Sequence, residues 1–302
     1  MKLLLVHGRS QEDKNPAVLR TKWETALYDG AEAVGLDVPI TEDDIVFPYF
    51  GDALLDLTAS EHPEHHRHEG EVAPITRANE HYDDPEFRCR VLNECLDAAG
   101  VDYDRIWERA APEVRKAGPL SREWVQVGLA LLDRFVPSVS AFSLNLAAED
   151  VAMYLENPTI QAFIETGIAR AVEDIDPNEE FVVVGHSLGS IIAYRILAEG
   201  GVMASRPVRL FLTLGSPLGI TAVRTALHPI AHPPNVESWF NAYDDRDAVA
   251  LHPLDETFFP ITPAIENYGG VENNTKNRHG IAGYLTDEVI ATRLINALSA
   301  GE

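Results

Sequence analysis

The segment 181–190, Phe-Val-Val-Val-Gly-His-Ser-Leu-Gly-Ser, contains residue types at a spacing that could perform covalent chemistry. Four apolar residues predict a buried strand, and the apolar spacing of 191–198 predicts a helix directly after it. Ser187 therefore lies on a sharp strand-to-helix turn, where strained backbone angles expose its hydroxyl. Gly185 and Gly189 lie two residues to either side, where strand and helix pass too closely for side chains. The pattern predicts a nucleophilic serine, and a glycine turn with a purely structural role is the alternative.

This Gly-His-Ser-Leu-Gly turn resembles the nucleophile elbow of the α/β-hydrolase superfamily, particularly of its lipase and esterase branches. The resemblance covers residues 1–50 and 158–302, and it implies a mostly parallel central sheet flanked by helices. In this superfamily a serine, an acid and a histidine follow in that chain order, each beyond the carboxyl end of a strand. A serine hydroxyl is a weak nucleophile at neutral pH, so the histidine serves as its base and the acid orients the histidine.

The acid that the resemblance implies lies in the segment 244–250, Asp-Asp-Arg-Asp-Ala-Val-Ala, after an expected strand at 236–243. In lipase-like hydrolases an aspartate precedes a short Pro-Val or Ala-Val step, and that match falls on Asp247. Asp244 is the second candidate. A turn in which the aspartates only shape the loop is the structural alternative.

Four histidines late in the chain compete for the role of base: His228, His232, His252 and His279. The first two precede the acid, and His252 follows Asp247 closely enough to share its loop. His279 comes after the last strand-like stretch and before the terminal helix, which is where this superfamily places its base. Gly280 next to it lets the backbone turn tightly. The resemblance therefore implies His279, and a histidine in a surface loop or in the core is the alternative.

The negative charge that develops on the attacked carbonyl oxygen needs fixed hydrogen-bond donors. One expected donor is the backbone N–H of Leu188, directly after the nucleophile. The sequence His7-Gly8-Arg9 follows the first predicted strand and resembles the His-Gly oxyanion motif of the superfamily. That match implies the backbone N–H of Arg9 as the second donor, with Ser10 next in line.

Several neighbours of these residues are expected to support the site without reacting. His7 and Gly8 belong to the first motif, and Gly185, His186 and Gly189 belong to the second. His7 is expected to be a structural hydrogen-bonding residue. The segment 215–217, Gly-Ser-Pro, also resembles lipase-type chains; it is expected to shape the pocket wall, with no catalytic role for Ser216.

Short apolar runs predict the strands that would position these residues. They are expected at 3–6, 45–50, 181–184, 208–214, 236–243 and 266–273. Helices are expected around them, at 16–34, 159–175, 191–198 and 284–298. The strand–helix–strand order at the start of the chain predicts a βαβ unit and hence a parallel sheet.

Between residues 51 and 157 the sequence predicts helices in place of parallel strands. They are expected at 86–99, 103–116, 121–135 and 147–156, with Ser121 as an N-cap. We interpret 51–157 as an inserted helical cap or lid over the sheet, between the two parts of the core. Its apolar stripe would either line an acyl pocket or, more simply, pack on the core: Trp124, Val127, Leu131 and Phe135.

The histidine-rich segment 61–69 raises the question of a metal site. His65 and His68 would share a face if the segment were helical. However, Pro63, the density of charges and the lack of apolar partners favour a solvated loop. No metal or cofactor is expected, and the serine chemistry requires none.

Composition limits the class of protein and its partners. The chain has 302 residues with 45% hydrophobic and 24% charged residues, which is typical of a globular protein. A formal net charge of −24 argues against nucleic-acid binding and against docking on anionic membranes. The chain has neither a membrane-length apolar run nor a signal-peptide pattern, so a cytoplasmic location without membrane insertion is expected. Cys89 and Cys95 would lie on different faces of one helix, so no disulfide between them is expected.

Together these observations predict a serine hydrolase that cleaves the carboxylic ester of a small molecule through an acyl-enzyme. A thioesterase, an amidase or an acyltransferase with the same triad is the nearest alternative. A catalytically silent hydrolase fold that serves as a binding module is the alternative from another class.

Overall fold

The computed structural model describes residues 1–8, 15–51, 85–135, 141–198 and 200–299. Arg9 and Ser10, the candidates for the second oxyanion donor, lie outside the described residues. So do the histidine-rich segment 61–69 and the rest of 52–84, which belongs to the expected cap.

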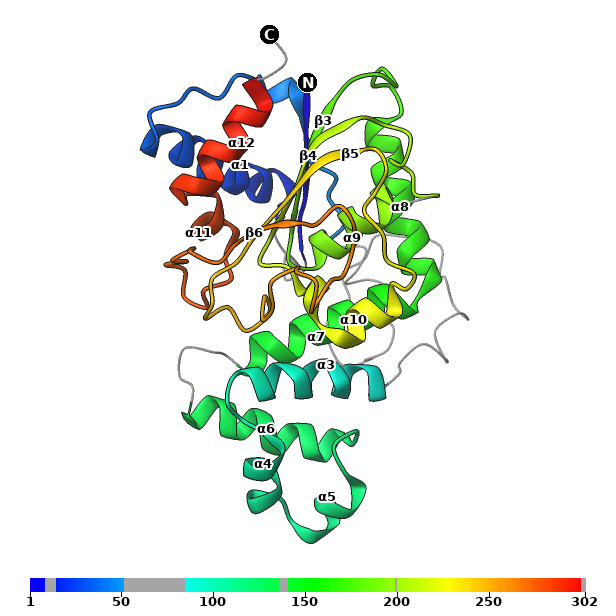
Figure 1. Cartoon of the computed structure of the whole chain (residues 1–302), viewed down its shortest axis with the longest axis vertical. Helices are drawn as coiled ribbons and strands as arrows, with labels where there is room; N and C mark the ends of the chain where they lie inside the picture. Colours follow the sequence, from blue (N-terminus) through cyan, green and yellow to red (C-terminus); the bar gives the residue numbers. More distant parts are fainter. Residues whose placement is uncertain (9–14, 52–84, 136–140, 199, 300–302) are drawn as a thin grey trace.

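Six parallel strands form one sheet in the order β2-β1-β3-β4-β5-β6 (Figure 1). Their bounds are β1 Lys2–Val6, β2 Ile45–Val46, β3 Phe181–His186, β4 Val208–Leu214, β5 Val236–Ala242 and β6 Glu266–Tyr268. The prediction of a parallel sheet is confirmed. The two edge strands are shorter than expected: Pro48 lacks the N–H that would extend β2, and Gly269 and Gly270 end β6.

Helices cover both faces of the sheet, which explains why the strands read as continuous apolar runs. On one face, Leu3 and Leu5 of β1 belong to the same apolar cluster as α1 (Pro16–Ala33) and α12 (Glu288–Ser299). On the other face, Leu4 and Val6 join the cluster that contains α8 (Pro158–Val172) and α9 (Leu188–Leu197). Figure 1 shows these two helix pairs on opposite sides of the strands.

A block of helices lies beyond the carboxyl ends of the strands (Figure 1). It comprises α3 Pro85–Ala98, α4 Tyr103–Arg109, α5 Pro112–Ala117, α6 Arg122–Phe135 and α7 Ala141–Glu156. The expected single helix at 103–116 is wrong, because Ala110 and Ala111 are extended before Pro112 and a second helix begins there. Ser121 caps α6 as predicted, since the N–H of Trp124 donates to its Oγ over 3.2 Å.

The helical block shares its apolar core with the sheet. Leu96, Leu132 and Tyr154 are buried in the same cluster as Leu4 and Val183. Of the predicted stripe, Trp124 and Leu131 are buried in this cluster and Val127 packs against it. The stripe therefore serves as the packing face of α6, which was the simpler of the two interpretations.

The remaining elements complete the connections at the sheet edge. They are η1 Glu42–Asp44, η2 Pro217–Gly219, α10 Thr221–Ala226 and α11 Ile281–Leu285. The expected terminal helix at 284–298 is divided into α11 and α12, because the side chain of Asp287 accepts the Val289 and Ile290 N–H groups and starts a new helix. Cys89 and Cys95 are both buried, and no disulfide joins them, as predicted. No helix among the described residues has the length and apolar character needed to cross a bilayer.

Candidate active site

Ser187 occupies a strained turn between β3 and α9. Its backbone angles are φ 56° and ψ −131°, a combination that costs an ordinary residue about 1–3 kcal/mol. The Ser187 N–H donates to the carbonyl of Leu214 over 3.1 Å, which fixes the turn to the end of β4. Its hydroxyl does not cap α9, it has no hydrogen bond to a described residue, and the residue is only partly buried. The fold thus presents this hydroxyl at the sheet edge.

The glycines around Ser187 are required by close contacts. A Cβ at Gly185 would lie 2.7 Å from the Cα of Ser190, and a Cβ at Gly189 would lie 2.1 Å from the carbonyl oxygen of Val6. A Cβ at Gly8 would lie 2.9 Å from the Cβ of Ser187. The end of β1 therefore lies directly beside the serine, as the two predicted motifs require.

Two hydroxyl groups, which the sequence did not predict, form a hydrogen-bonded chain to the backbone of the turn at Ser187. The Ser190 hydroxyl donates to the carbonyl of Ser187 over 2.6 Å, so it accepts from the Ser216 hydroxyl, 2.7 Å away. Ser216 in turn accepts the N–H of Leu218 over 3.3 Å. Ser216, which was expected only to shape the pocket wall, thus supports the backbone of the elbow.

The two other predicted triad residues form a direct hydrogen bond. His279 Nδ1 lies 2.7 Å from Oδ2 of Asp247, whose side chain is fully buried. The other carboxylate oxygen, Oδ1, accepts the N–H of Val249 over 2.9 Å. An ionised carboxylate only accepts, so Nδ1 carries the proton and Nε2 of the neutral ring is left with a lone pair. That Nε2 is buried and has no hydrogen-bond partner among the described residues.

Asp244, the second candidate for the acid, has a different set of partners. It accepts hydrogen bonds from the N–H groups of Arg246 and Asn273, both over 2.8 Å, and from the Arg278 guanidinium over 3.2 Å. Burial alone would raise the pKa of Asp244, but these three donors lower that pKa below its usual value. Asp244 therefore joins its own loop to the loop that carries His279.

The other late histidines are engaged elsewhere. His252 Nε2 lies 3.1 Å from the Glu94 carboxylate, and its ring stacks on Phe258 with a centroid distance of 3.9 Å. His232 Nδ1 contacts the carbonyl of Pro233 over 3.1 Å, and the backbone N–H of His228 donates to Thr225. Of the four candidates, only His279 contacts Asp247 in the described structure.

Two buried neutral histidines support the site. Burial, reinforced by the nearby His279 ring, lowers the pKa of His186 to about 3, and its Nε2–H donates to the carbonyl of His279 over 2.7 Å. Burial lowers the pKa of His7 to about 4. His7 Nδ1 donates to the carbonyl of Gly8 over 2.6 Å, and its Nε2 accepts the N–H of Phe50 over 3.3 Å. His7 therefore has the hydrogen bonds of a structural residue.

The predicted donor next to the nucleophile lies at a helix N-terminus. Leu188 is the first residue of α9, and the first N–H groups of a helix have no acceptor within the helix. The helix dipole adds partial positive charge at this position. An oxyanion beside Ser187 would find a suitable donor there.

Two further residues at this edge had no predicted role in the triad. The Tyr284 hydroxyl donates to Oδ2 of Asp247 over 2.6 Å. Gly215, with φ 55°, makes room for this cluster, since its Cβ would lie 3.0 Å from Tyr284, 3.1 Å from Asp247 and 3.2 Å from His279. The Gly-Ser-Pro resemblance indicated the glycine, whereas no local pattern distinguished Tyr284 from other helix residues.

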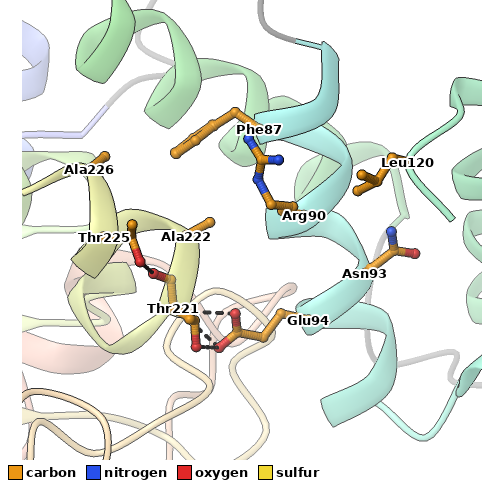
Figure 2. Close-up of a pocket in the computed structure, with 9 residues that line it drawn as sticks. All are labelled: Phe87, Arg90, Asn93, Glu94, Leu120, Thr221, Ala222, Thr225 and Ala226. Atoms are coloured by element: carbon orange, nitrogen blue, oxygen red, sulfur yellow. Dashed lines mark hydrogen bonds between the residues drawn. The ribbon is translucent and has the colours of Figure 1, made fainter.

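A cavity of about 580 Å³ opens between α3 and α10, at the junction of the helical block and the core (Figure 2). Its lining residues are Phe87, Arg90, Asn93, Glu94, Leu120, Thr221, Ala222, Thr225 and Ala226. None of these is a predicted triad residue. Glu94 accepts from the N–H and the hydroxyl of Thr221, and from His252, so it connects α3 to α10 and to the loop after Asp247.

Within the described residues, no group of three histidine, cysteine, aspartate or glutamate side chains could hold a metal ion. Comparisons of the chain with protein-family models, curated proteins and solved structures find no match. The functional conclusion therefore depends on the residues at the sheet edge and on their geometry.

Proposed function

We propose that this protein is a serine hydrolase of the α/β-hydrolase type that cleaves carboxylic esters of small molecules. The observation that carries the proposal is the buried hydrogen bond between Asp247 and His279, with the other ring nitrogen of His279 unpaired among the described residues. It occurs at the same sheet edge as the strained turn that presents Ser187. A base, its orienting acid and a free hydroxyl are the components that serine chemistry needs.

The order of these residues along the fold supports the same class. Ser187 follows β3, Asp247 follows β5 and His279 follows β6, and all three strands run parallel. Their carboxyl ends therefore meet at one edge, which is where open parallel sheets bind ligands. The chain order serine, aspartate, histidine is the order found in α/β-hydrolases.

The rings at this edge support a base in the neighbourhood of the serine. The His186 and His279 rings are 4.8 Å apart between centroids, and His186 directly precedes Ser187. A Cβ at Gly215 would lie 3.2 Å from the His279 ring, and the backbone N–H of Ser187 donates a hydrogen bond to the carbonyl of Leu214, the residue before Gly215. These contacts of Ser187 with Leu214 and of Gly215 with the His279 ring support a shared site beyond β4.

In the proposed reaction, Nε2 of His279 takes the proton of the Ser187 hydroxyl as Oγ attacks the ester carbonyl carbon. The carbonyl oxygen gains the displaced electron pair and is stabilised by the N–H of Leu188 and, by the resemblance, of Arg9. When the C–O bond of the ester breaks, the His279 imidazolium gives its proton to the departing alcohol. A water molecule then attacks the acyl-enzyme carbonyl while His279 takes its proton. The bond to Ser187 Oγ breaks, His279 returns the proton to Oγ, and the carboxylic acid is released.

The helices from α3 to α7 fit the role of a cap in this proposal. They lie beyond the carboxyl ends of the strands (Figure 1), and Ser187, Asp247 and His279 follow the ends of β3, β5 and β6. A cap in this position would limit access of water and select the substrate. We assign residues 51–157 to this cap, and 1–50 with 158–302 to the catalytic core.

Steady-state hydrolysis of p-nitrophenyl esters of increasing acyl length tests the proposal, with thioester and anilide analogues measured alongside. Ser187→Ala should lower kcat by roughly 10⁵-fold or more without changing the thermal melt. Ser205→Ala, at an exposed serine far along the chain from the elbow, is the matched control and should leave kcat unchanged. Equal ester turnover by wild type and Ser187→Ala would overturn the proposal.

A further inference from the structure

Tyr284 has a hydrogen-bond geometry that fixes the direction of its hydroxyl. It lies in α11, five residues after His279, and its side chain is fully buried. Its oxygen lies 3.4 Å from the backbone N–H of Asp244 and 2.6 Å from Oδ2 of Asp247. Because an N–H group can only donate, the tyrosine oxygen accepts from Asp244 and its single hydrogen points to Asp247.

The tyrosine and the histidine share one carboxylate oxygen. Oδ2 of Asp247 accepts from both Tyr284 and His279, while Oδ1 accepts from Val249. Three donors on two oxygens fix the plane of the carboxylate as well as its position. The hydroxyl therefore contacts the atom through which Asp247 acts on His279.

The surroundings keep Tyr284 in the protonated form that can donate. Burial, and then the negative charge of Asp247, raise the pKa of the Tyr284 hydroxyl well above its usual value. The Tyr284 ring packs beside the His186 ring at a centroid distance of 5.9 Å, and it fits there because Gly215 has no side chain. The phenol is thus a permanent donor over the whole range in which a histidine titrates.

We propose that Tyr284 is a positioning residue for the hydrolase reaction, an inference that rests on the proposed function. Its hydroxyl holds Oδ2 of Asp247 opposite Nδ1 of His279 and disperses the negative charge of that oxygen. A hydrogen bond to a carboxylate favours the charged form and makes it a weaker base. Tyr284 therefore weakens the electrostatic attraction between Asp247 and the imidazolium that His279 becomes during the reaction.

The titratable groups around Asp247 and His279 are not expected to add a step of their own to the pH dependence of kcat/KM. His186 from β3 is buried and stays neutral, and Lys22 from α1 acts on His186. Cys95 from α3 has a pKa raised by burial, and Asp244, bonded to Arg278, has a lowered one. The acid limb of kcat/KM against pH is therefore the readout for a change at the Asp247–His279 pair.

Tyr284→Phe removes the hydroxyl and keeps the ring. We expect kcat/KM for a p-nitrophenyl ester to fall about tenfold, because losing the hydrogen bond that fixes the Asp247 carboxylate outweighs the gain from a more basic carboxylate. We also expect the acid limb of kcat/KM against pH to move upward, because a more basic Asp247 stabilises the imidazolium. KM should change little, since the hydroxyl does not contact substrate in the proposed site.

Tyr154→Phe is the matched control. Tyr154 is also fully buried and donates to a carboxylate, that of Glu165, over 3.2 Å, but it belongs to α7 and α8 packing. This variant should retain the wild-type pH profile.

If Tyr284→Phe does not fold, 3-fluorotyrosine at position 284 is the second probe. Its phenol is more acidic and donates a stronger hydrogen bond to Asp247, so the acid limb of kcat/KM should move to lower pH.

The outcomes separate this inference from the function on which it rests. Wild-type protein without ester turnover would overturn both. Active wild type, with Tyr284→Phe equal to it in rate and pH profile, would overturn the role of Tyr284 and leave the hydrolase proposal intact. A slower Tyr284→Phe with a lower melting temperature and an unmoved acid limb would show a structural residue only, and would also overturn the inference.

Discussion

The carboxyl edge of the sheet and the helical block of residues 85–135 and 141–156 are filled with different kinds of side chain. Buried polar residues gather at or just beyond the strand ends: His7, His186, Thr213, Ser216, Asn241, Asp244, Asp247 and Asn273. In the described part of the block, Asp150 is buried and polar, as is Asn157 directly after α7, and apolar side chains fill the rest of its core. Buried polar groups are costly unless they are hydrogen-bonded, so their concentration at this edge supports the site proposed there.

Backbone strain follows the same division. In the part of the chain that the structure describes, the non-glycine residues with positive φ are Ser187 and Arg278, and both lie at the sheet edge. Arg278 directly precedes His279, so the proposed nucleophile is itself a strained residue and the proposed base directly follows one. Strain of this kind persists only where the surrounding contacts determine the conformation. The helical block relies on ordinary caps and apolar packing.

The largest expected change in kcat comes from two aspartates at the carboxyl edge of the sheet. Asp247→Asn should lower kcat by roughly 10⁴-fold, because the histidine loses the acceptor that orients its Nδ1–H. Asp244→Asn should keep kcat within about tenfold and instead lower the melting temperature, since it weakens an ion pair between loops. Ester kinetics and thermal melts of both variants test this, and equal losses of kcat would show that the two aspartates do not have separate roles.

A smaller effect compares two glycines, one from each region. At Gly189 an added Cβ would meet the backbone oxygen of Val6, which cannot move, so Gly189→Ala should lose about 3 kcal/mol of stability. At Gly128 in α6 the nearest atoms are terminal methyl groups of Leu96 and Ile106, which can rotate away. Gly128→Ala should stay within about 1 kcal/mol of wild type, because better helix propensity offsets the tighter contact. Urea unfolding of the two variants checks the ranking, and a larger loss at Gly128 would contradict it.

The smallest effect concerns the contact that joins the two regions. Glu94→Ala removes a carboxylate that accepts from Thr221 (Figure 2) and from His252. The loss should cost about 1–3 kcal/mol of stability at neutral pH. Burial alone would raise the pKa of Glu94, but the donors from His252 and Thr221 lower it below the ordinary 4.5. A lowered folded-state pKa means that the stability difference from wild type is complete above pH 4.5 and narrows as the pH falls below it.

Urea unfolding of wild type and Glu94→Ala between pH 3.5 and 7 measures that difference. Glu108→Ala, at an exposed glutamate of α4, is the control and should show no such trend. If the difference in unfolding free energy between wild type and Glu94→Ala grew as the pH fell, the lowered pKa assigned to Glu94 would be contradicted.

Much of the fold followed from local patterns in the sequence. The continuous apolar runs at β1, β3, β4 and β5 and the glycine spacing around Ser187 depend on neighbouring residues, so they could be predicted. The break before Pro112 and the short edge strands were missed, although Pro112, Pro48 and the Gly269-Gly270 pair were visible signals. Those errors came from giving apolar periodicity more weight than the residues that interrupt it.

The candidate site was predictable only as far as motifs reach. Asp247 and His279 are 32 residues apart, and the resemblance to a family, not their spacing, indicated that they would meet. The hydroxyl chain from Ser216 to Ser190 and the bond from Tyr284 to Asp247 join distant segments through single side chains. No local pattern encodes such contacts, because they depend on how β4, β5 and α11 pack together.

The most direct measurement of the proposed activity is labelling of the whole protein with a fluorophosphonate probe, followed by intact-mass and peptide mapping. An activated serine beside a neutral histidine should give one adduct, on the peptide that contains Ser187, and Ser187→Ala should give none. Ser205→Ala should label like wild type. A folded protein that takes up no probe, or that is still labelled after Ser187→Ala, would contradict the assignment of Ser187 as the nucleophile.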